Sequence, residues 1–568
     1  MDHVVIVLSS QDIPGVITTA TRLGPGCRVA CFDPSVLDEL KAAGLPQAEY
    51  VDFPGAPTFP DLHNGSREEA LAIEADLFGL FGPVLPGVRS FAWLHLNWYY
   101  LLIALRWYSA LGEYIAAHYA GLFGSRKAMV LLNDNPANFF WPSFVPALCV
   151  LEALSRAGVA LEAFSYEPRP DETGALPALL AGDDRSERWD LLTHLPTCMH
   201  DVPMLEEELK ASGRRIINIR AKYWDTPVPA AHDVGLGHKH DLLRIVPENV
   251  RNTLNLLLPH VQARIDAVLA PHIRVDAYRE RQAKQLTSLY ETQLLTYLLL
   301  HDFFAGRKPR KMLLCDHDAG FHGPLIAYAD AEGIPVLFFP HSKTIADIQF
   351  SADNVACLVH PVQGASLNDG AGRRVAHHKL AFPETLSAFT VLPHGLRTVG
   401  LLLNSITLNG VMVGGWQPFM DGIRLVANWC RRHGVALEVR SRPGHSIYEM
   451  VAEATGIPAD TLAANMRKPL SQFAAEIDLC LMYDAPTTAE LEFLRRNVPI
   501  LNPIPEALAK YEAVIACTDI IPRGAVEEIL FRMEGFASDP ANLHAFKLQQ
   551  FAAYAGAFRD AAPLRAYL

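Results

Sequence analysis

Residues 311–341 constrain the fold of this chain more than any other stretch, because two apolar, strand-like runs lie there on either side of a helical segment. Met312–Cys315 is a short apolar run, typical of a strand buried on both faces of a sheet. A helix is expected from about Pro324, since proline suits a first helical turn, to Gly333, a common C-terminal cap. Ile334–Phe339 is the next predicted strand. This order predicts two parallel neighbours in an α/β sheet.

Polar side chains follow both of these predicted strands. Asp316 and Asp318 come after the first strand, and His341 comes after the second. Ligands bind at the carboxyl ends of strands in open parallel sheets, so two carboxylates and an imidazole there are candidate catalytic groups. Asp and His also form turns and caps in such loops, and this structural interpretation stays open for each residue taken alone.

The composition restricts the class of protein. The chain has 568 residues, half of them hydrophobic, which indicates a globular protein with more than one core. The net charge is −13 and no basic block stands out, which argues against a nucleic-acid partner. The nine cysteines form no CxxC pair, which argues against zinc and disulfides. His3–Leu8 is read as a strand and not as a signal peptide, so we expect a cytoplasmic protein, free or peripheral to the inner membrane.

Phe91–Trp107 is the most apolar and aromatic stretch of the chain. A membrane span needs about 20 apolar residues, and this stretch is interrupted by His95, Asn97 and Arg106. We therefore expect a buried helix that continues to about Tyr119. The alternative is a surface that docks on a membrane or on a partner protein.

The pattern of strands and helices divides the chain in two. Residues 3–43 alternate strand, helix, strand, helix, and the same pattern restarts at Thr398–Asn404. We expect an α/β protein with two Rossmann-like, doubly wound domains, residues 1–395 with helical insertions and residues 396–568. The final predicted helix, Ala541–Phe558, is expected to cross back to the first domain.

The second domain carries a possible anion site at a predicted strand–helix junction. Thr487 and Thr488 precede a helix, and two hydroxyls beside free backbone N–H groups suit a phosphate. Glu490 lies three residues after Thr487, so a capping box formed by these two side chains is the structural alternative.

A second group of polar residues follows the predicted strand Val435–Arg440. Arg440, Arg442, His445 and Ser446 lie within seven positions of one another. Guanidinium groups bind phosphate or carboxylate through paired hydrogen bonds, although solvated loop residues would look the same. The sequence has no GxGxxG and no Walker loop, so we expect neither a nicotinamide cofactor nor ATP hydrolysis.

Taken together, these motifs resemble the GT-B glycosyltransferases, and more narrowly the bacterial transferases of surface polysaccharides that use CMP-activated acidic sugars. Residues 333–341 are similar to a stretch that ends in Gln-His-Gly or a relative, and Asp316–Gly320 occupies the place of the catalytic acid. Residues 440–443 occupy the place of a Lys-x-His-Pro motif, and Thr487-Thr488 that of a Ser-Ser or Ser-Thr pair. Two positions depart from the pattern, since Arg442 replaces the motif histidine and Ser342 stands where glycine is common.

The resemblance implies a transferase that moves an acidic sugar, 3-deoxy-manno-octulosonic acid (Kdo) in the first place, from a CMP-sugar to a surface glycan acceptor such as lipopolysaccharide or capsule. In a retaining β-Kdo transferase, Asp316 or Asp318 would be the nucleophile; in an inverting enzyme the same carboxylate would be the general base. His341 would assist, the residues of the second domain would hold the phosphate, and no metal or cofactor would be required. A UDP- or GDP-sugar enzyme and an inactive scaffold that binds a partner through Phe91–Trp107 are the alternatives.

Overall fold

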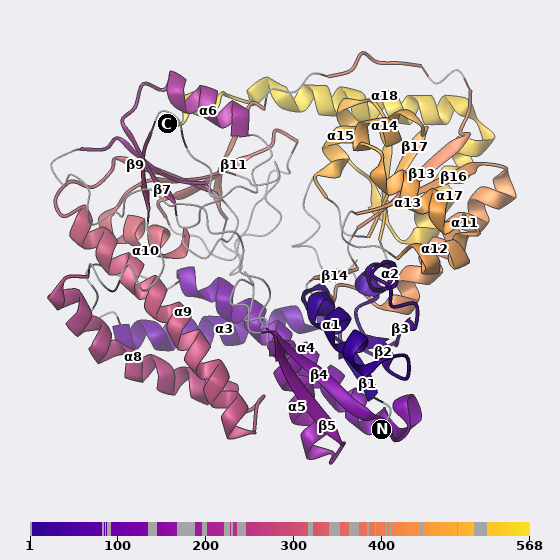
Figure 1. Ribbon diagram of the computed structural model, residues 1–568. Helices are drawn as coiled ribbons and strands as arrows, with labels where there is room; N and C mark the ends of the chain where they lie inside the picture. Colours follow the sequence, from indigo (N-terminus) through magenta and orange to yellow (C-terminus); the bar gives the residue numbers. More distant parts are fainter. Residues whose placement is uncertain are drawn as a thin grey trace.

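We describe the protein from a computed structural model, shown in Figure 1. It describes residues 3–81, 85, 87, 92–133, 145–166, 188–195, 202–220, 228, 231–235, 243, 246–315, 322–339, 353–362, 374–382, 386–391, 394–404, 406–408, 410–442, 447–484, 487–504 and 520–568. Three parallel sheets organise these residues, with a small antiparallel hairpin beside the third.

The first sheet lies in the N-terminal part of the chain, and its order is β3-β2-β1-β4-β5. Its strands are β1 (His3–Val7), β2 (Arg28–Cys31), β3 (Ala48–Tyr50), β4 (Lys127–Asn133) and β5 (Leu161–Tyr166). Every neighbouring pair is parallel. The order runs outward from β1 in both directions, so the switch in strand order lies between β1 and β4.

The second sheet has the order β12-β11-β10-β9-β6-β7-β8. Its strands are β6 (Leu191–His194), β7 (Ile216–Arg220), β8 (Ala231–Gly235), β9 (Lys311–Cys315), β10 (Val336–Phe339), β11 (Val355–Val359) and β12 (Ala376–Lys379). The strands predicted at 312–315 and 334–339 are β9 and β10, and they are parallel, with Phe339 opposite Cys315. The switch in order lies between β6 and β9, so the carboxyl end of β9 borders the position where a ligand binds in such sheets.

The third sheet has the order β16-β13-β17-β18-β19. Its strands are β13 (Thr398–Leu403), β16 (Ala436–Ser441), β17 (Leu479–Tyr483), β18 (Ile500–Pro503) and β19 (Arg523–Gly524). The apolar face of α11 (Trp416–His433) packs on it, and Gly434 ends that helix in a left-handed conformation. The switch in order lies between β13 and β17.

These sheets confirm the α/β class and the parallel, Rossmann-like organisation. The expected N-terminal unit, residues 1–395, contains two such sheets instead of one. The second sheet was missed because two long helices, α8 (Glu248–Leu269) and α9 (Asp276–Phe303), separate β8 from β9 in the chain. Their apolar pattern was recognised from the sequence, but the pairing of β6 with β9 across them leaves no local signal.

A group of long helices lies below the second sheet and to the left of the first sheet in Figure 1. α4 (Ala92–Phe123) packs against α3 (Phe59–Phe81), α5 (Val145–Arg156) and α10 (His322–Glu332). Residues 98–105 of α4 are buried almost without exception, and full burial of each large apolar side chain contributes roughly 1.5–3 kcal/mol. The expected buried helix is confirmed.

Arg106, one of the polar interruptions of this apolar stretch, has partners inside the protein. The Arg106 guanidinium donates to the Ser66 hydroxyl at 2.7 Å and pairs with Glu69, both on α3. Residues 98–107 therefore offer little exposed surface for a membrane or a partner, and the side chains of residues 91–97 lie outside the description. Across the described residues, no helix combines the length and the apolar character that a membrane crossing needs.

The chain returns from the third sheet to the second through its last helix, α18 (Pro540–Ala557), which spans the top of Figure 1. The Gln550 amide bonds both the N–H and the C=O of Ile500 in β18, at 2.8 and 2.9 Å. After the helix, Ala562 makes two main-chain hydrogen bonds at the end of β12. Leu564 is fully buried against the second sheet. The tail thus connects the units built on these two sheets.

Candidate functional site

The carboxyl edge of the third sheet is the candidate ligand site that the described residues define best. Asn404 follows β13, Arg442 follows β16, and Asp484 follows β17. The register places Leu403 opposite both Ser441 and Tyr483, so these three strand ends are level. With strands about 4.8 Å apart, the ends of β16 and β17 are roughly 10 Å apart, on either side of the end of β13.

Asp484 has an unusual backbone conformation at this edge. Its φ is 74°, in the left-handed region that residues other than glycine rarely adopt. Its side chain is buried, with 1% exposed. The Asn502 amide of β18 donates to the Asp484 carbonyl oxygen at 2.9 Å and also to that of Met482, which fixes the end of β17. A buried acidic residue whose strained backbone is fixed at a switch position is typical of a binding site.

The predicted threonine pair lies at the start of α15 (Ala489–Arg495). Thr488 is the N-cap, without a hydrogen bond from its side chain, and the Thr487 hydroxyl accepts from the Ala489 N–H at 3.3 Å. The capping box considered for Thr487 and Glu490 is not formed. Both hydroxyls are half-buried beside the end of β17, so they remain candidates for contact with a ligand.

Glu490 is buried in the first turn of α15, with 1% exposed. Burial raises the pKa of its carboxyl group to about 8, and the charge of Arg523 offsets only part of this effect. Its Oε1 has no hydrogen-bond partner among the described residues. At pH 7 the group is therefore mainly neutral, so it can donate a hydrogen bond to an anion instead of repelling it.

The two predicted arginines have different surroundings. The Arg440 guanidinium lies beside the C-terminus of α13 (Ala459–Arg467), where it donates to the carbonyl oxygens of Met466 at 3.4 Å and Lys468 at 3.2 Å. This contact satisfies carbonyl groups that the helix leaves open, which is a structural role. Arg442 is exposed beyond the end of β16, at the edge described above. The predicted His445 and Ser446 lie outside the described residues.

The predicted catalytic residues Asp316, Asp318 and His341 also lie outside the described residues. The strands that lead to them are described, and their carboxyl ends lie side by side. Sequence reasoning missed His194, which ends β6 on the other side of the switch position, opposite Leu314. It is buried, and its Nδ1 lies 2.9 Å from the Ile219 carbonyl oxygen. The sequence signal that could have identified His194 is its position at the end of a strand-like run, Leu191–His194.

The carboxyl edge of the first sheet is closed by groups of the protein itself. After β1, the Asp12 carboxylate accepts from the N–H groups of Leu8 at 2.8 Å and Ser9 at 3.1 Å, the positions that a phosphate would need. Burial raises the pKa of Asp12 to about 7. Gly410, between β14 (Thr407–Leu408) and β15 (Val411–Met412), lies so close that an added Cβ would stand 2.6 Å from the Leu8 carbonyl oxygen. This edge therefore has no room for a ligand at β1.

Within the described ranges, no group of three or more His, Cys, Asp or Glu side chains lies together in a way that could hold a metal ion. The seven cysteines of these ranges are buried.

No family model and no curated protein matches the chain. Among solved structures, it is similar to the glycosyltransferase SnogD from Streptomyces nogalater, with 13% identity over 67% of this chain and 98% of that one, at a TM-score of 0.34. It is also similar to Arabidopsis thaliana UGT89C1 complexed with quercetin (12%, 66% and 94%, 0.32). A third is WaaG, a glycosyltransferase involved in lipopolysaccharide biosynthesis (10%, 65% and 99%, 0.31). TM-scores this low do not establish a shared fold, and the α/β class follows from the three parallel sheets themselves.

Proposed function

We propose that the protein is a GT-B glycosyltransferase that transfers an acidic sugar, Kdo in the first place, from a CMP-sugar donor to a surface glycan acceptor. The observation that carries the proposal is the carboxyl edge of the third sheet. There Arg442, Thr487 and Thr488 flank the switch position, and the buried neutral acid Glu490 lies beside them. A cation, two hydroxyls and a neutral carboxyl group suit the phosphate of a nucleotide-activated sugar.

We propose that the units of the second and third sheets are the two facing domains of this transferase. The C-terminal tail supports this pairing, because it leaves the third sheet and docks on the second. His360, which follows β11 of the second sheet, also packs against Tyr554 and Phe558 of that tail region, with ring centroids 6.3 and 5.4 Å apart. The first sheet, whose edge is closed at β1, would then be an additional supporting unit within residues 1–395.

In the proposed reaction, the third sheet holds the donor and the second supplies the carboxylate. For a retaining enzyme, an oxygen of Asp316 or Asp318 bonds to the anomeric carbon as the bond from that carbon to the CMP phosphate oxygen breaks, and CMP leaves. The acceptor hydroxyl then displaces the carboxylate and gives up its proton. In an inverting enzyme the carboxylate takes this proton in a single displacement. Arg442 and the two threonines stabilise the negative charge on the departing phosphate, and His341 assists proton transfer.

The direct test is to incubate the protein with CMP-Kdo, CMP-sialic acid, a UDP-sugar and a GDP-sugar, and to measure release of the free nucleotide with and without a glycan acceptor. CMP release that depends on the acceptor is the expected result. In parallel, CMP should raise the melting temperature more than UDP or GDP does. Release of UDP or GDP alone would change the donor class, and a protein that binds glycan without releasing any nucleotide would be a scaffold.

A further inference from the structure

The amino-terminal edge of the second sheet carries a concentration of positive charge that the proposed reaction does not use. Leu191 of β6 is opposite Ile216 of β7 and Lys311 of β9, so the loops before these three strands meet at one edge. Six basic side chains in these loops form what we call the basic edge: Arg188, Arg214, Arg215, Arg307, Lys308 and Arg310. Residues 307–311, of which four in five are basic, were not singled out from the sequence.

Five of the six side chains of the basic edge are exposed, and Arg307 is half-buried. The exposed fraction is 78% for Arg310, 60% for Arg215 and 52% for Lys308. Asp190 approaches both Arg310, at 3.6 Å, and Arg215, at 4.0 Å, which places these two arginines on either side of one carboxylate. Burial, together with the charge of Arg214, lowers the pKa of the neighbouring Lys311.

Among the described residues, basic groups outnumber acidic groups at this edge. Asp190 is the only acid in the described loop residues 188–190, 212–215 and 305–311, and Glu332 pairs with Lys308. The protein as a whole carries a net charge of −13, so the excess of positive charge here opposes the overall balance. Clustered exposed cations on an acidic protein form an attractive surface for anions.

The surroundings of the basic edge favour a flat anionic surface as the partner. Single-stranded nucleic acid binding needs exposed aromatic side chains for stacking, but Trp189, the aromatic residue of these loops, is buried and stacks on His232 with ring centroids 5.4 Å apart. A protein partner would need an apolar centre within the contact. Large exposed apolar side chains of the described residues lie elsewhere, on α8 and α17 (Val526–Ser538) for example.

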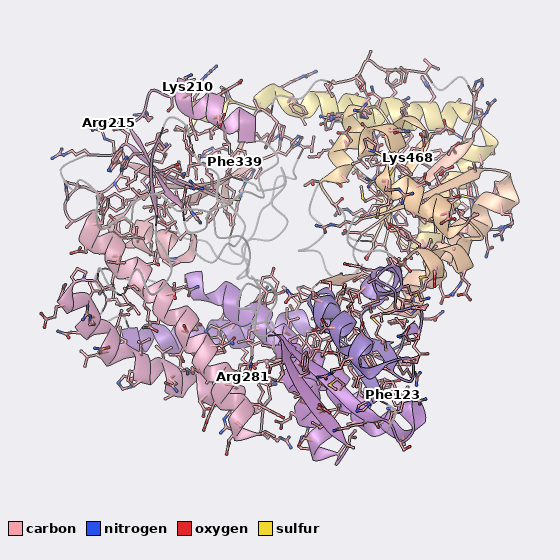
Figure 2. All side chains as sticks on the ribbon, viewed as in Figure 1. Phe123, Lys210, Arg215, Arg281, Phe339 and Lys468 are labelled. Carbon is pink, nitrogen blue, oxygen red and sulfur yellow. The ribbon has the colours of Figure 1, made fainter. Side chains whose placement is uncertain are left out.

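We propose that the basic edge binds the headgroups of an anionic lipid bilayer. The surface lies at the amino ends of the strands, whereas the catalytic residues are proposed at the carboxyl ends, about 15 Å away along strands of four or five residues. Figure 2 shows Arg215 at the outer margin of the molecule and Phe339, at the carboxyl end of β10, on the inner side. A bilayer on the basic edge therefore leaves the carboxyl edge open. This proposal does not depend on the proposed reaction.

Vesicle flotation of the full chain tests this proposal. The vesicles are phosphatidylcholine alone or with about 40% phosphatidylglycerol, at low and at high salt, since charge attraction of this kind is screened by salt. We expect flotation with the anionic vesicles only, and loss of flotation at high salt. The double variant Arg214→Glu and Arg310→Glu should bind anionic vesicles at least about tenfold more weakly, because each basic residue near such a surface contributes about fivefold.

The matched control is Arg432→Glu with Arg467→Glu, two exposed arginines of the third-sheet unit, which should float like the wild type. The melting temperature of each variant establishes that it is folded, and Arg188→Gln with Arg214→Gln provides a milder change if the first variant is not. Equal flotation of the wild type and both basic-edge variants would overturn the proposal. So would equal binding to neutral vesicles, or tighter binding to a short DNA duplex than to anionic vesicles at the same salt concentration.

Discussion

The first and third sheets are both parallel and five-stranded, but their carboxyl edges differ. In the first, Asp12 occupies the backbone N–H groups that follow β1, and the hairpin that carries Gly410 covers them. In the third, the corresponding edge has an exposed Arg442, half-buried hydroxyls at Thr487 and Thr488, and no covering hairpin among the described residues. Parallel sheet topology alone therefore does not identify a nucleotide site. The groups at the strand ends do.

The two edges also differ in the hydrogen bonding of their buried acidic side chains. At the first sheet, Asp12 and Asp33 are both bound by internal donors: Asp33 accepts from the Ser35 N–H at 2.9 Å, the Ser35 hydroxyl at 2.6 Å and the Thr407 hydroxyl at 3.2 Å. At the third sheet, Oε1 of Glu490 has no partner among the described residues. A satisfied buried carboxylate stabilises an interface, whereas one with a free oxygen is available to a ligand.

The largest effect is expected at the closed edge. Gly410→Ala places a Cβ 2.3 Å from the Tyr108 hydroxyl, at a residue whose φ is +89°. Overpacking and a left-handed alanine should together lower the free energy of unfolding by roughly 2–5 kcal/mol, measured by urea denaturation. The control is Gly121→Ala in α4, where nothing lies within 4 Å of the added atom. If Gly410→Ala is as stable as that control, the first edge is not closed as described.

The second effect tests which sheet opposes the third in the reaction. Asp316→Asn keeps the size of the side chain and removes its charge, so turnover should fall by at least about a hundredfold in the CMP-release assay. Asp318→Asn is made in parallel because either residue can be the catalytic one. Asp12→Asn makes the same chemical change at the first sheet and should leave turnover within about twofold. Loss of turnover in Asp12→Asn alone would move the catalytic edge to the first sheet.

The third effect tests the open edge. Arg442→Ala should weaken CMP binding by roughly 1–3 kcal/mol, the range for a lost charged hydrogen bond, as measured by calorimetry. Arg440→Lys is a useful companion, because Arg440 contacts the end of α13 and its effect should be on stability more than on CMP affinity. Unchanged affinity in Arg442→Ala would remove this residue from the donor site.

The smallest effect is a dependence of stability on pH. The folded pKa of Asp12, about 7, lies above the ordinary value of 3.8 for an aspartate, so between these values the folded state binds more protons than the unfolded one. Stability should therefore fall as pH rises through this window, by about 1 kcal/mol from pH 5.5 to pH 6.5. Asp12→Asn should flatten this part of the curve, while Glu490→Gln should flatten the part that extends to about pH 8. Identical slopes in all three proteins would contradict both assignments.

The elements that were predicted correctly from the sequence are those that a local residue pattern marks. β9, α10 and β10 lie close to their predicted bounds, because an apolar run, a proline and a glycine mark each change of structure. The buried helix α4 was recognised in the same way. The division of residues 1–395 into two sheets was missed, since β6 and β9 pair across a long stretch of intervening chain.

Site residues were harder to predict than elements. Arg440 and Arg442 look equivalent in the sequence, because residues two apart in a strand lie on the same side. Only the end of α13 shows that Arg440 has a structural partner. Asp484 was not singled out from the sequence, because its main-chain carbonyl group is held by Asn502, which comes from a different strand. Long-range contacts of this kind determine a site and leave no local pattern.

The docking of the C-terminal tail has a consequence for synthesis of the protein. Leu564 belongs to the apolar core on one face of the second sheet, whereas the last strand of that sheet ends at Lys379. The ribosome must therefore add roughly 180 further residues before the cover of this face is complete, which takes about 10 to 40 seconds at usual rates of translation. During that interval the nascent chain exposes an apolar sheet face, and we expect a chaperone to bind there until the tail is released.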